Sequence, residues 1–185
     1  PHLYDDDTQI YGACSPTAAD TFLSKMTECI DAVAEWMRSN RLQLNADKTE
    51  FLWCTTGRRQ TRLPAGGPTI GSVAVPPSAS VRNLGVFVDS DLSMRTHVQR
   101  TASRCFAVLR QLRSIRRSVP IAVFQSLVVC LVLSRLDYCN SVLFGLPANL
   151  TNRLQSVQNA AARLVYGLRR YDHVTGALAS LHWLR

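Results

Sequence analysis

Three adjacent carboxylates near the start of the chain are the residues best suited to chemistry. Asp5, Asp6 and Asp7 lie between His2-Leu3-Tyr4 and Thr8-Gln9-Ile10-Tyr11, two short segments that each carry an aromatic residue. Such segments favour strands, and Asp favours the turn between them. The sequence therefore predicts a β-hairpin with the acids at its tip.

Neighbouring carboxylates repel one another, and a divalent cation removes that repulsion. Carboxylate oxygens are the ligands that Mg²⁺ prefers, and it usually takes one or two of them from a protein. Two such ions about 3.5–4 Å apart clamp the attacking and leaving oxygens of a phosphoryl transfer. The acids therefore predict a magnesium site for nucleotidyl transfer, with a solvated acidic turn as the alternative.

The context of the acids resembles motif C of reverse transcriptases, an aromatic-x-Asp-Asp sequence inside a strand-turn-strand. The wider form, His-Leu-Tyr-x-Asp-Asp-Thr-Gln-Ile-Tyr in this chain, resembles the version found in non-LTR (LINE-type) retrotransposons. Tyr4, Asp6 and Asp7 fall on the matching positions. The family usually has a small residue, commonly Ala, where this sequence has Asp5, so an additional negative charge lies beside the implied metal site.

Residues 42–51 read Leu-x-Leu-Asn-x-x-Lys-Thr-x-Phe, which resembles the region after motif C in LINE-type reverse transcriptases, usually treated as part of motif D. On that resemblance, Lys48 lies near the incoming nucleotide. It is a candidate to protonate the pyrophosphate leaving group. A plain surface lysine is the alternative.

Three later blocks extend the resemblance in the same order along the chain. Leu-Gly-Val-x-x-Asp at residues 84–89, followed by Leu-Ser, resembles the segment with the primer-grip hairpin, motif E. Residues 134–140 and 154–165 match further blocks of these elements, Ser-x-Leu-Asp-Tyr-Cys-Asn and Leu-Gln-x-Val-Gln-Asn-Ala-Ala-Ala-Arg-Leu-Val. We expect Asp89 and Asp91 to cap a helix or a turn rather than bind metal.

The net charge of +8 is distributed unevenly. Residues 1–91 hold eleven acids and eight bases, whereas residues 92–185 hold two acids and thirteen bases, all of them Arg. An acidic segment with a predicted metal site is thus followed by a strongly cationic one. This division favours a protein that binds a phosphate backbone.

The segment from residue 92 to 117 concentrates this positive charge, with no acid between residues 92 and 136. An acid-free run of Arg on a helix and its exit favours a nucleic-acid backbone alongside, and a solvated basic face is the alternative. The predicted nucleic-acid-binding residues are Arg95, Arg100, Arg104, Arg110, Arg113, Arg116 and Arg117.

Hydrophobic periodicity predicts the elements that position these residues. A helix should begin at Ser15-Pro16 and end at Asn40, residues 51–54 should form a buried strand, and 57–80 a loop with a short β-ribbon. After strand-like residues 81–89 we expect an Arg-rich helix from Met94, a buried core helix at 121–133, a helix at 151–166 ended by Gly167, and a further helical element near residue 173.

The six cysteines show no Cys-x-x-Cys pair and no His at ligand spacing, so the pattern indicates neither a zinc site nor a disulfide framework. A reducing compartment, cytoplasm or nucleus, is expected. The apolar run at 121–133 is too short to span a bilayer, where about 20 residues are needed, so no membrane partner is expected.

The resemblance implies an α+β fold, with residues 1–91 as the C-terminal part of a polymerase palm and 92–185 as a helical thumb and its extension. It implies an RNA-directed DNA polymerase that uses an RNA template, a DNA primer, a dNTP and two Mg²⁺ ions. The family's further metal-binding Asp, in motif A, would lie before Pro1, so the isolated chain is expected to be inactive. The alternatives are a non-catalytic nucleic-acid-binding remnant or domesticated segment, and an unrelated α+β protein.

Overall fold

The computed structural model describes residues 2–4 and 7–183, and for residues 2–4 and 7 it describes the backbone alone. Helices occur together with short two-stranded sheets, so the predicted α+β class is confirmed. The chain forms two compact units: Pro1–Val81 with Ser90–Leu92, here called the N-terminal unit, and Arg82–Asp89 with Ser93–Arg185, here called the helical unit. Residues 82–89 thus group with the helices, although we predicted them on the palm side of a boundary at 91.

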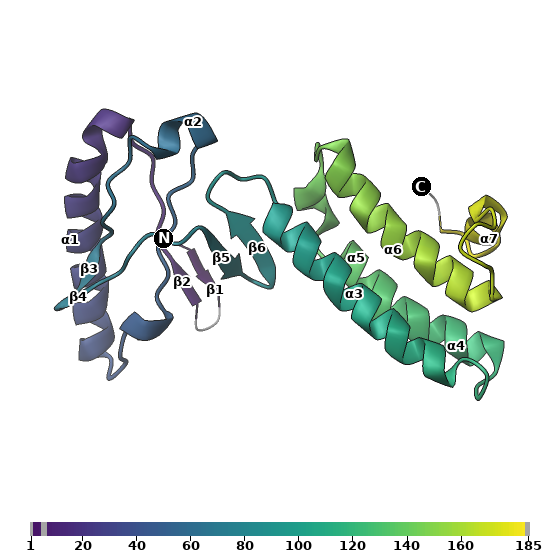
Figure 1. The fold of residues 1–185 in the computed structure, drawn as a ribbon. Helices are drawn as coiled ribbons and strands as arrows, with labels where there is room; N and C mark the ends of the chain where they lie inside the picture. Colours follow the sequence, from purple (N-terminus) through teal and green to yellow (C-terminus); the bar gives the residue numbers. More distant parts are fainter. Residues whose placement is uncertain (1, 5–6, 184–185) are drawn as a thin grey trace. The chain divides into compact units, whose positions relative to one another are not determined.

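The N-terminal unit begins with a hairpin of β1 (His2–Tyr4) and β2 (Asp7–Gln9) and continues into a long helix (Figure 1). The 3-10 turn η1 (Pro16–Ala18) leads into α1 (Ala19–Ser39), as the Pro predicted. Asn40 ends the helix because its side-chain Nδ2 and its backbone N–H both donate to the carbonyl of Trp36, at 2.9 and 3.1 Å. The predicted end at Asn40 is therefore confirmed, whereas at the start a 3-10 turn from Pro16 precedes the α-helix, and Ser15 makes no side-chain capping bond.

A small apolar cluster holds the N-terminal unit together. Ile30 of α1 packs against Ile70 of β3 (Thr69–Ile70) and against Val75, which follows β4 (Val73–Ala74). The two strands are antiparallel, in agreement with the predicted short β-ribbon, and α2 (Gly57–Gln60) precedes them. Four partly buried residues surround this N-terminal cluster: Ile10, Leu44, Ala46 and Phe51.

The predicted strand at residues 51–54 is wrong. Only an isolated bridge forms there, between Phe51 and Pro77, and Cys54 is exposed. A ladder cannot extend along this partner because proline has no N–H to donate, and Pro76 precedes Pro77. Trp53 is held by ring contacts instead, with centroid distances of 5.0 Å to Phe51 and 6.0 Å to Phe22.

A further hairpin, formed by β5 (Ser80–Asn83) and β6 (Val86–Asp89), precedes the helices, and from Arg82 onward it belongs to the helical unit. Leu84 and Gly85 form its turn with φ angles of 44° and 86°. Positive φ at both central residues is the geometry of a tight hairpin turn whose twist matches the strands. The predicted strand-like segment is therefore two strands with a sharp reversal between them.

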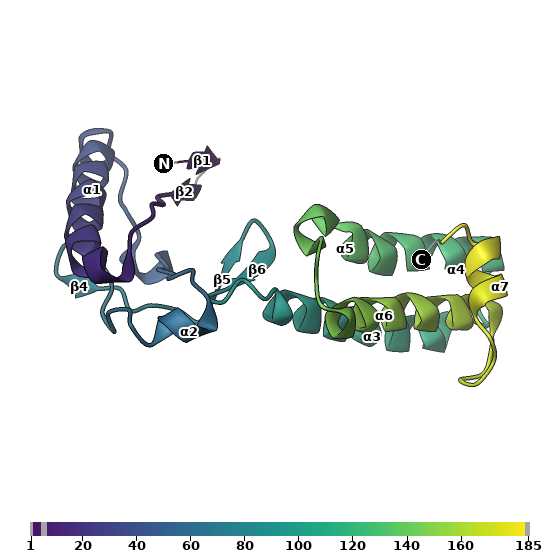
Figure 2. The ribbon, with the colours of Figure 1, turned by 90° about the horizontal axis from the view of Figure 1, so that it is seen from above.

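Three long helical stretches follow and lie side by side (Figures 1 and 2). They are α3 (Arg95–Ile115), the continuous run of α4 (Ile121–Val128), the π-helical segment η3 (Val129–Leu133) and α5 (Ser134–Asp137), and α6 (Ala148–Tyr166). The 3-10 turn η4 (Asn140–Leu143) lies between the second and the third. The short helix α7 (Thr175–Ser180) comes last.

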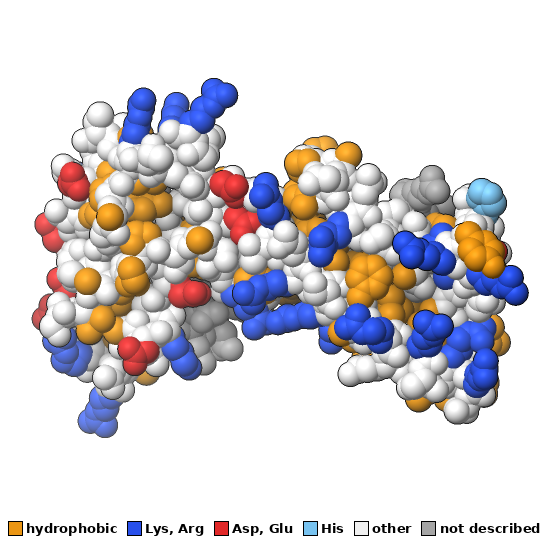
Figure 3. Space-filling model, viewed as in Figure 1, with side chains coloured by type: hydrophobic (Ala, Val, Ile, Leu, Met, Phe, Trp, Pro, Cys, Tyr) orange, Lys and Arg blue, Asp and Glu red, His pale blue; other side chains and the backbone are white. Residues whose placement is uncertain are grey.

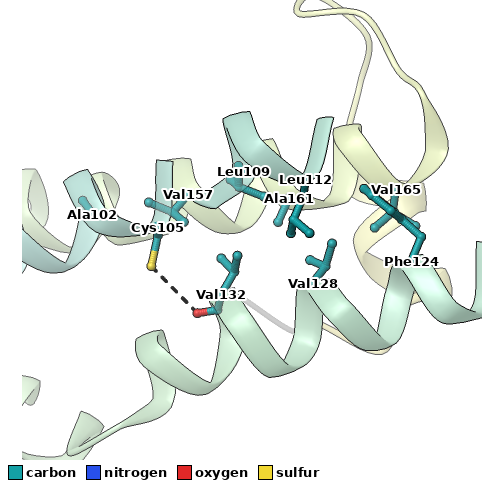
Figure 4. Packing of buried hydrophobic residues seen from close by; sticks show 10 residues of the cluster. All are labelled: Ala102, Cys105, Leu109, Leu112, Phe124, Val128, Val132, Val157, Ala161 and Val165. Carbon is teal, nitrogen blue, oxygen red and sulfur yellow. Dashed lines mark hydrogen bonds between the residues drawn. The ribbon is translucent and has the colours of Figure 1, made fainter. Parts of the chain in front are cut away.

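The core of the helical unit is a seam between these three stretches (Figure 4). The middle stretch contributes Phe124, Val128 and Val132, one residue per turn, all at most 1% exposed. The thiol of Cys105 lies in the seam and donates to the carbonyl of Val132 at 3.9 Å, and burial raises the pKa of this thiol. The α3 and α6 residues of the seam are Ala102, Cys105, Leu109, Leu112, Val157, Ala161 and Val165.

The prediction of a buried core helix at 121–133 is confirmed for one face of the stretch, which carries Phe124, Val128 and Val132, and is wrong for the other. Ile121 is 55% exposed, and Val123 and Val129 are 48% and 42% exposed. The stretch packs against α3 and α6 with the face that carries Phe124, Val128 and Val132, and the opposite face is exposed. None of the helices in the described part of the chain has the length and apolar composition to cross a membrane.

Two phenylalanines of the helical unit give a matched test of this core. Phe124 is 1% exposed and Phe144 is 96% exposed. We expect Phe124→Ala to lower the free energy of unfolding by about 3–5 kcal/mol because it leaves a cavity in the seam. Phe144→Ala should change it by no more than about 0.5 kcal/mol. Urea unfolding followed by circular dichroism measures both, and equal effects would contradict the described packing.

Candidate functional site

The acidic hairpin has the strand pairing that the sequence predicts. β1 and β2 are antiparallel, and Tyr4 is paired with Asp7. Asp5 and Asp6, the two residues between them in the sequence, lie outside the described residues, as do the side chains of Tyr4 and Asp7. The roles of Asp6 and Asp7 as metal ligands and of Tyr4 beside the primer and nucleotide stay predictions.

Lys48 lies in a turn that shares a packing cluster with the base of this hairpin. Ile10, three residues after Asp7, and Ala46, two residues before Lys48, both pack against the N-terminal cluster. Asn45 shapes the turn η2 (Ala46–Lys48), because its Oδ1 accepts from the backbone N–H of Lys48 at 3.2 Å. The Lys48 side chain is exposed, so it is accessible to a ligand.

Metal-binding capacity depends on the acids at the tip. Among residues 8–183, whose side chains are described, no three His, Cys, Asp or Glu side chains gather closely enough to hold a metal ion. Asp6 and Asp7 are outside that set. Two carboxylates fit Mg²⁺ chemically, because this ion takes one or two from a protein and completes its octahedron with phosphate and water.

Helix α3 carries a dense set of exposed cations and no acid. Its buried stripe, from Val98 to Leu112, faces the seam, so the arginines occupy the remaining surface. At about 100° per residue, Arg95 and Arg113 share one side of this surface, and Arg104 lies on the other. Figure 3 shows arginine side chains, in blue, spread over the helical unit, which has no lysine. Six of the seven predicted arginines are exposed: Arg95, Arg100, Arg104, Arg110, Arg113 and Arg117.

Arg116, the seventh, has a structural role that the sequence did not reveal. Its Nε donates to the carbonyl of Leu164 at 2.6 Å and its Nη2 to that of Val165 at 3.1 Å. These carbonyls belong to the last turn of α6, where they lack helical partners and where a cation is favoured. Gly167 leaves room for this contact, since a Cβ there would lie 2.9 Å from Arg116 Nη2.

The β5–β6 hairpin is anchored to the start of α3 by Asp89. Its Oδ2 accepts from the backbone N–H of Thr96 at 3.0 Å and from the hydroxyl of Ser93 at 3.2 Å. The carboxylate thus satisfies a free donor in the first turn of α3 and opposes the positive end of the helix. The prediction that Asp89 is a capping acid is confirmed.

Three further contacts hold the same hairpin. The ring Nδ1 of the buried His97 accepts from the backbone N–H of Phe87 at 3.4 Å, and the guanidinium of Arg100 lies 4.4 Å from the centre of the Phe87 ring. The hydroxyl of Tyr138 donates to the carbonyl of Leu84 at 2.6 Å. The hairpin is therefore part of the helical unit, although none of these contacts is visible in the periodicity of the sequence.

Comparisons with protein-family models, with curated proteins and with solved structures find no match to this chain. The residues themselves therefore carry what can be inferred about function. They are an acidic hairpin, an exposed lysine whose turn packs on the same cluster, and an acid-free helix with exposed arginines.

The protonation of His97 predicts how stability depends on pH. Burial lowers the pKa of His97 below its usual value near 6.5, and the nearby Asp89 carboxylate partly offsets this. The unfolded chain therefore binds a proton at a higher pH than the folded chain, so the free energy of unfolding should fall as pH is lowered through about 6.5. Urea unfolding at several pH values should show a shallower slope for His97→Gln. His173→Gln, at an exposed histidine, should leave the slope unchanged; equal slopes for all three proteins would disprove the assignment.

Arg116 and Arg117 give a matched test, because Arg116 bonds to the end of α6 whereas Arg117 is exposed. Arg116→Ala should destabilise the helical unit by about 1.5–3 kcal/mol, because it removes charged hydrogen bonds to the end of α6. Arg117→Ala, at an exposed position, should change stability by no more than about 0.5 kcal/mol. Thermal unfolding measures both, and a larger loss for Arg117→Ala would overturn the role given to Arg116.

Proposed function

We propose that this chain is the C-terminal palm and thumb portion of an RNA-directed DNA polymerase of the non-LTR retrotransposon type. The observation that carries the proposal is the convergence of the acidic hairpin and the Lys48 turn on one packing cluster, through Ile10 and Ala46. Residues separated by about forty positions, and matched to two motifs of the same enzyme class, are thereby supported by the same few side chains. The template would be RNA, the primer DNA and the substrate a dNTP.

The acidic hairpin would serve the chemical step. Asp6 and Asp7 would hold Mg²⁺ together with the Asp that motif A supplies in this enzyme class, and Tyr4 would border the primer end and the nucleotide. When bound, the two ions lower the energy of the attacking 3′-oxygen and of the leaving pyrophosphate. Lys48 donates a proton to the pyrophosphate, which its exposure permits.

The exposed arginines of α3 would hold the template–primer duplex by its phosphates. Such contacts position a duplex without reading its sequence, which suits an enzyme that must move along any template. Arg95 supports this function because it lies in the first turn of α3, where a cation is unfavourable for the helix itself. A ligand phosphate would relieve that cost.

A non-catalytic nucleic-acid-binding segment is the second candidate. The observation in its favour is that the cationic helix belongs to a compact unit with its own core, separate from the unit of the acidic hairpin. Binding would then need neither Asp6 nor Asp7. The additional charge of Asp5 also suits a protein that no longer binds a primer end beside metal.

Primer extension on an RNA template decides between these two functions. The protein tested is this chain joined to the reading frame that precedes it, compared with the Asp6→Asn, Asp7→Asn double variant and with Asp5→Ala. We expect dNTP incorporation that the double variant loses. The isolated chain should incorporate none. Incorporation by Asp5→Ala alone would favour the binding segment, and incorporation that survives the double variant would rule out the metal site.

The salt dependence of binding tests the cationic helix separately. Affinity falls as salt rises, and each lost phosphate contact makes the slope of log affinity against log salt less steep by about one. We expect the triple variant Arg110→Ala, Arg113→Ala, Arg117→Ala to bind a labelled duplex with a slope that is less steep by about three. A control with the same charge change is Arg58→Ala, Arg59→Ala, Arg62→Ala, at exposed positions in α2 and just after it, which should leave the slope almost unchanged. A larger change of slope for the Arg58, Arg59 and Arg62 variant would instead place the phosphate contacts around α2.

A further inference from the structure

The helical unit contains a cavity of about 370 Å³ that the proposed polymerase function does not use. It lies between the end of the middle helical stretch, the first half of α6 and the segment after α7. Its apolar wall includes Leu136 and Trp183, and its polar groups include Asp137, Gln155, Gln158 and His182. This volume lies within the range of ligand sites, about 300–1,000 Å³.

Two sequence blocks with no assigned role meet at this cavity. Asp137 belongs to the block at residues 134–140, and Gln155 and Gln158 belong to the block at 154–165. Neither block contributes to the acidic hairpin or to the arginine face of α3. The residues between the two blocks form the turn η4 and the start of α6, so the two polar sets are brought together by folding.

The amide groups in the cavity are held in one orientation. Gln155 Nε2 donates to Gln158 Oε1 at 2.9 Å and to Asn159 Oδ1 at 3.0 Å. These bonds commit the Gln155 amide nitrogen and the Gln158 amide oxygen. The Gln158 amide nitrogen remains a donor for a ligand, and the Asp137 carboxylate remains an acceptor.

Guanine offers the complementary edge. Its N1–H and its amino group are adjacent donors that a carboxylate accepts together, and its O6 accepts from an amide nitrogen. Adenine presents an acceptor at N1, which the Asp137 carboxylate would repel. Trp183 and His182 supply aromatic faces, and unstacked bases of single strands bind by stacking on such side chains while their edges are hydrogen-bonded.

Charge favours a nucleic acid over a basic peptide as the occupant. An arginine of a partner protein could also pair with Asp137 and stack on Trp183. However, residues 92–185 hold thirteen arginines and two acids, which attract polyanions and repel cationic partners.

We propose that this cavity binds one unstacked guanine of a single-stranded nucleic acid, with Asp137 and Gln158 reading its edge and Trp183 stacking on its face. The proposal rests on the nucleic-acid binding proposed above. It adds a base-specific contact to a surface whose other contacts are to phosphates.

Fluorescence anisotropy with short labelled oligouridines, each with a single central guanosine, adenosine, cytidine or uridine, tests this. The guanosine oligomer should bind about tenfold tighter than the adenosine oligomer, the discrimination expected of one bidentate pair. Asp137→Asn should abolish this ratio. Asp172→Asn, the matched charge change outside the cavity, should keep the ratio and raise the affinity for all four oligomers by a similar factor.

Further variants separate binding from folding. Trp183→Ala should weaken binding of the guanosine oligomer, and Trp183→Phe, which keeps an aromatic face, should restore part of it. Gln158→Ala should reduce the ratio, and Gln111→Ala on the exposed surface of α3 should not. Circular dichroism confirms that each variant is folded.

Equal affinity for all four oligomers, with a normal dependence on salt, would overturn the guanine site and leave the phosphate-binding function intact. Absence of binding to any oligomer would overturn both. An arginine-containing peptide that binds the chain and loses affinity in Asp137→Asn, while the oligomers show no preference, would assign the cavity to a protein partner instead.

Discussion

The seam between α3, the middle helical stretch and α6 is the constraint on which the helical unit depends. Phe124, Val128 and Val132 lie one turn apart and fill the space between the two long helices. Because α3 can bury only one stripe of its surface, its arginines must lie on the remaining arc, and no acid is present there to neutralise them. The same packing that stabilises the unit therefore produces its cationic face. The proposed phosphate binding would therefore depend on the same helix orientation that packs the core.

Charged and polar side chains near the ends of these helices form hydrogen bonds to backbone groups of helix ends and turns. Arg116 satisfies carbonyls at the end of α6, Asp89 satisfies a donor at the start of α3, and Tyr138 holds the turn of the β5–β6 hairpin. Each replaces a hydrogen bond that a helix end or a turn would otherwise take from water. These bonds attach the hairpin to the helices. In a polymerase this would make a primer-grip hairpin a rigid part of the thumb.

Much of this architecture follows from the sequence because it depends on local signals. The stripe of α3, the end of α1 at Asn40 and the end of α6 at Gly167 are set by periodicity and by residues with strong terminal preferences. The predicted strand at 51–54 is wrong because its bridge partner is Pro77, a residue distant in sequence that local signals do not reveal. The exposure of Ile121 depends on which elements pack against its helix, which is also a tertiary property. The candidate site likewise contains features that local sequence signals predict and features that they do not. Asp89 could be assigned as a cap, whereas the bonds of Arg116 and the cavity beside Asp137 arise only from tertiary packing.

The central claim is that the acidic hairpin and Lys48 form one metal-dependent site. Mn²⁺ in place of Mg²⁺ tests it most directly, through paramagnetic broadening of backbone amide signals in the isotope-labelled chain. The account predicts that Gln9, Ile10 and Lys48 broaden first and that the Asp6→Asn, Asp7→Asn variant loses this effect. Broadening that begins instead at the exposed acids of α1, which are Asp20, Glu28, Asp31 and Glu35, or that is unchanged in the double variant, would contradict it.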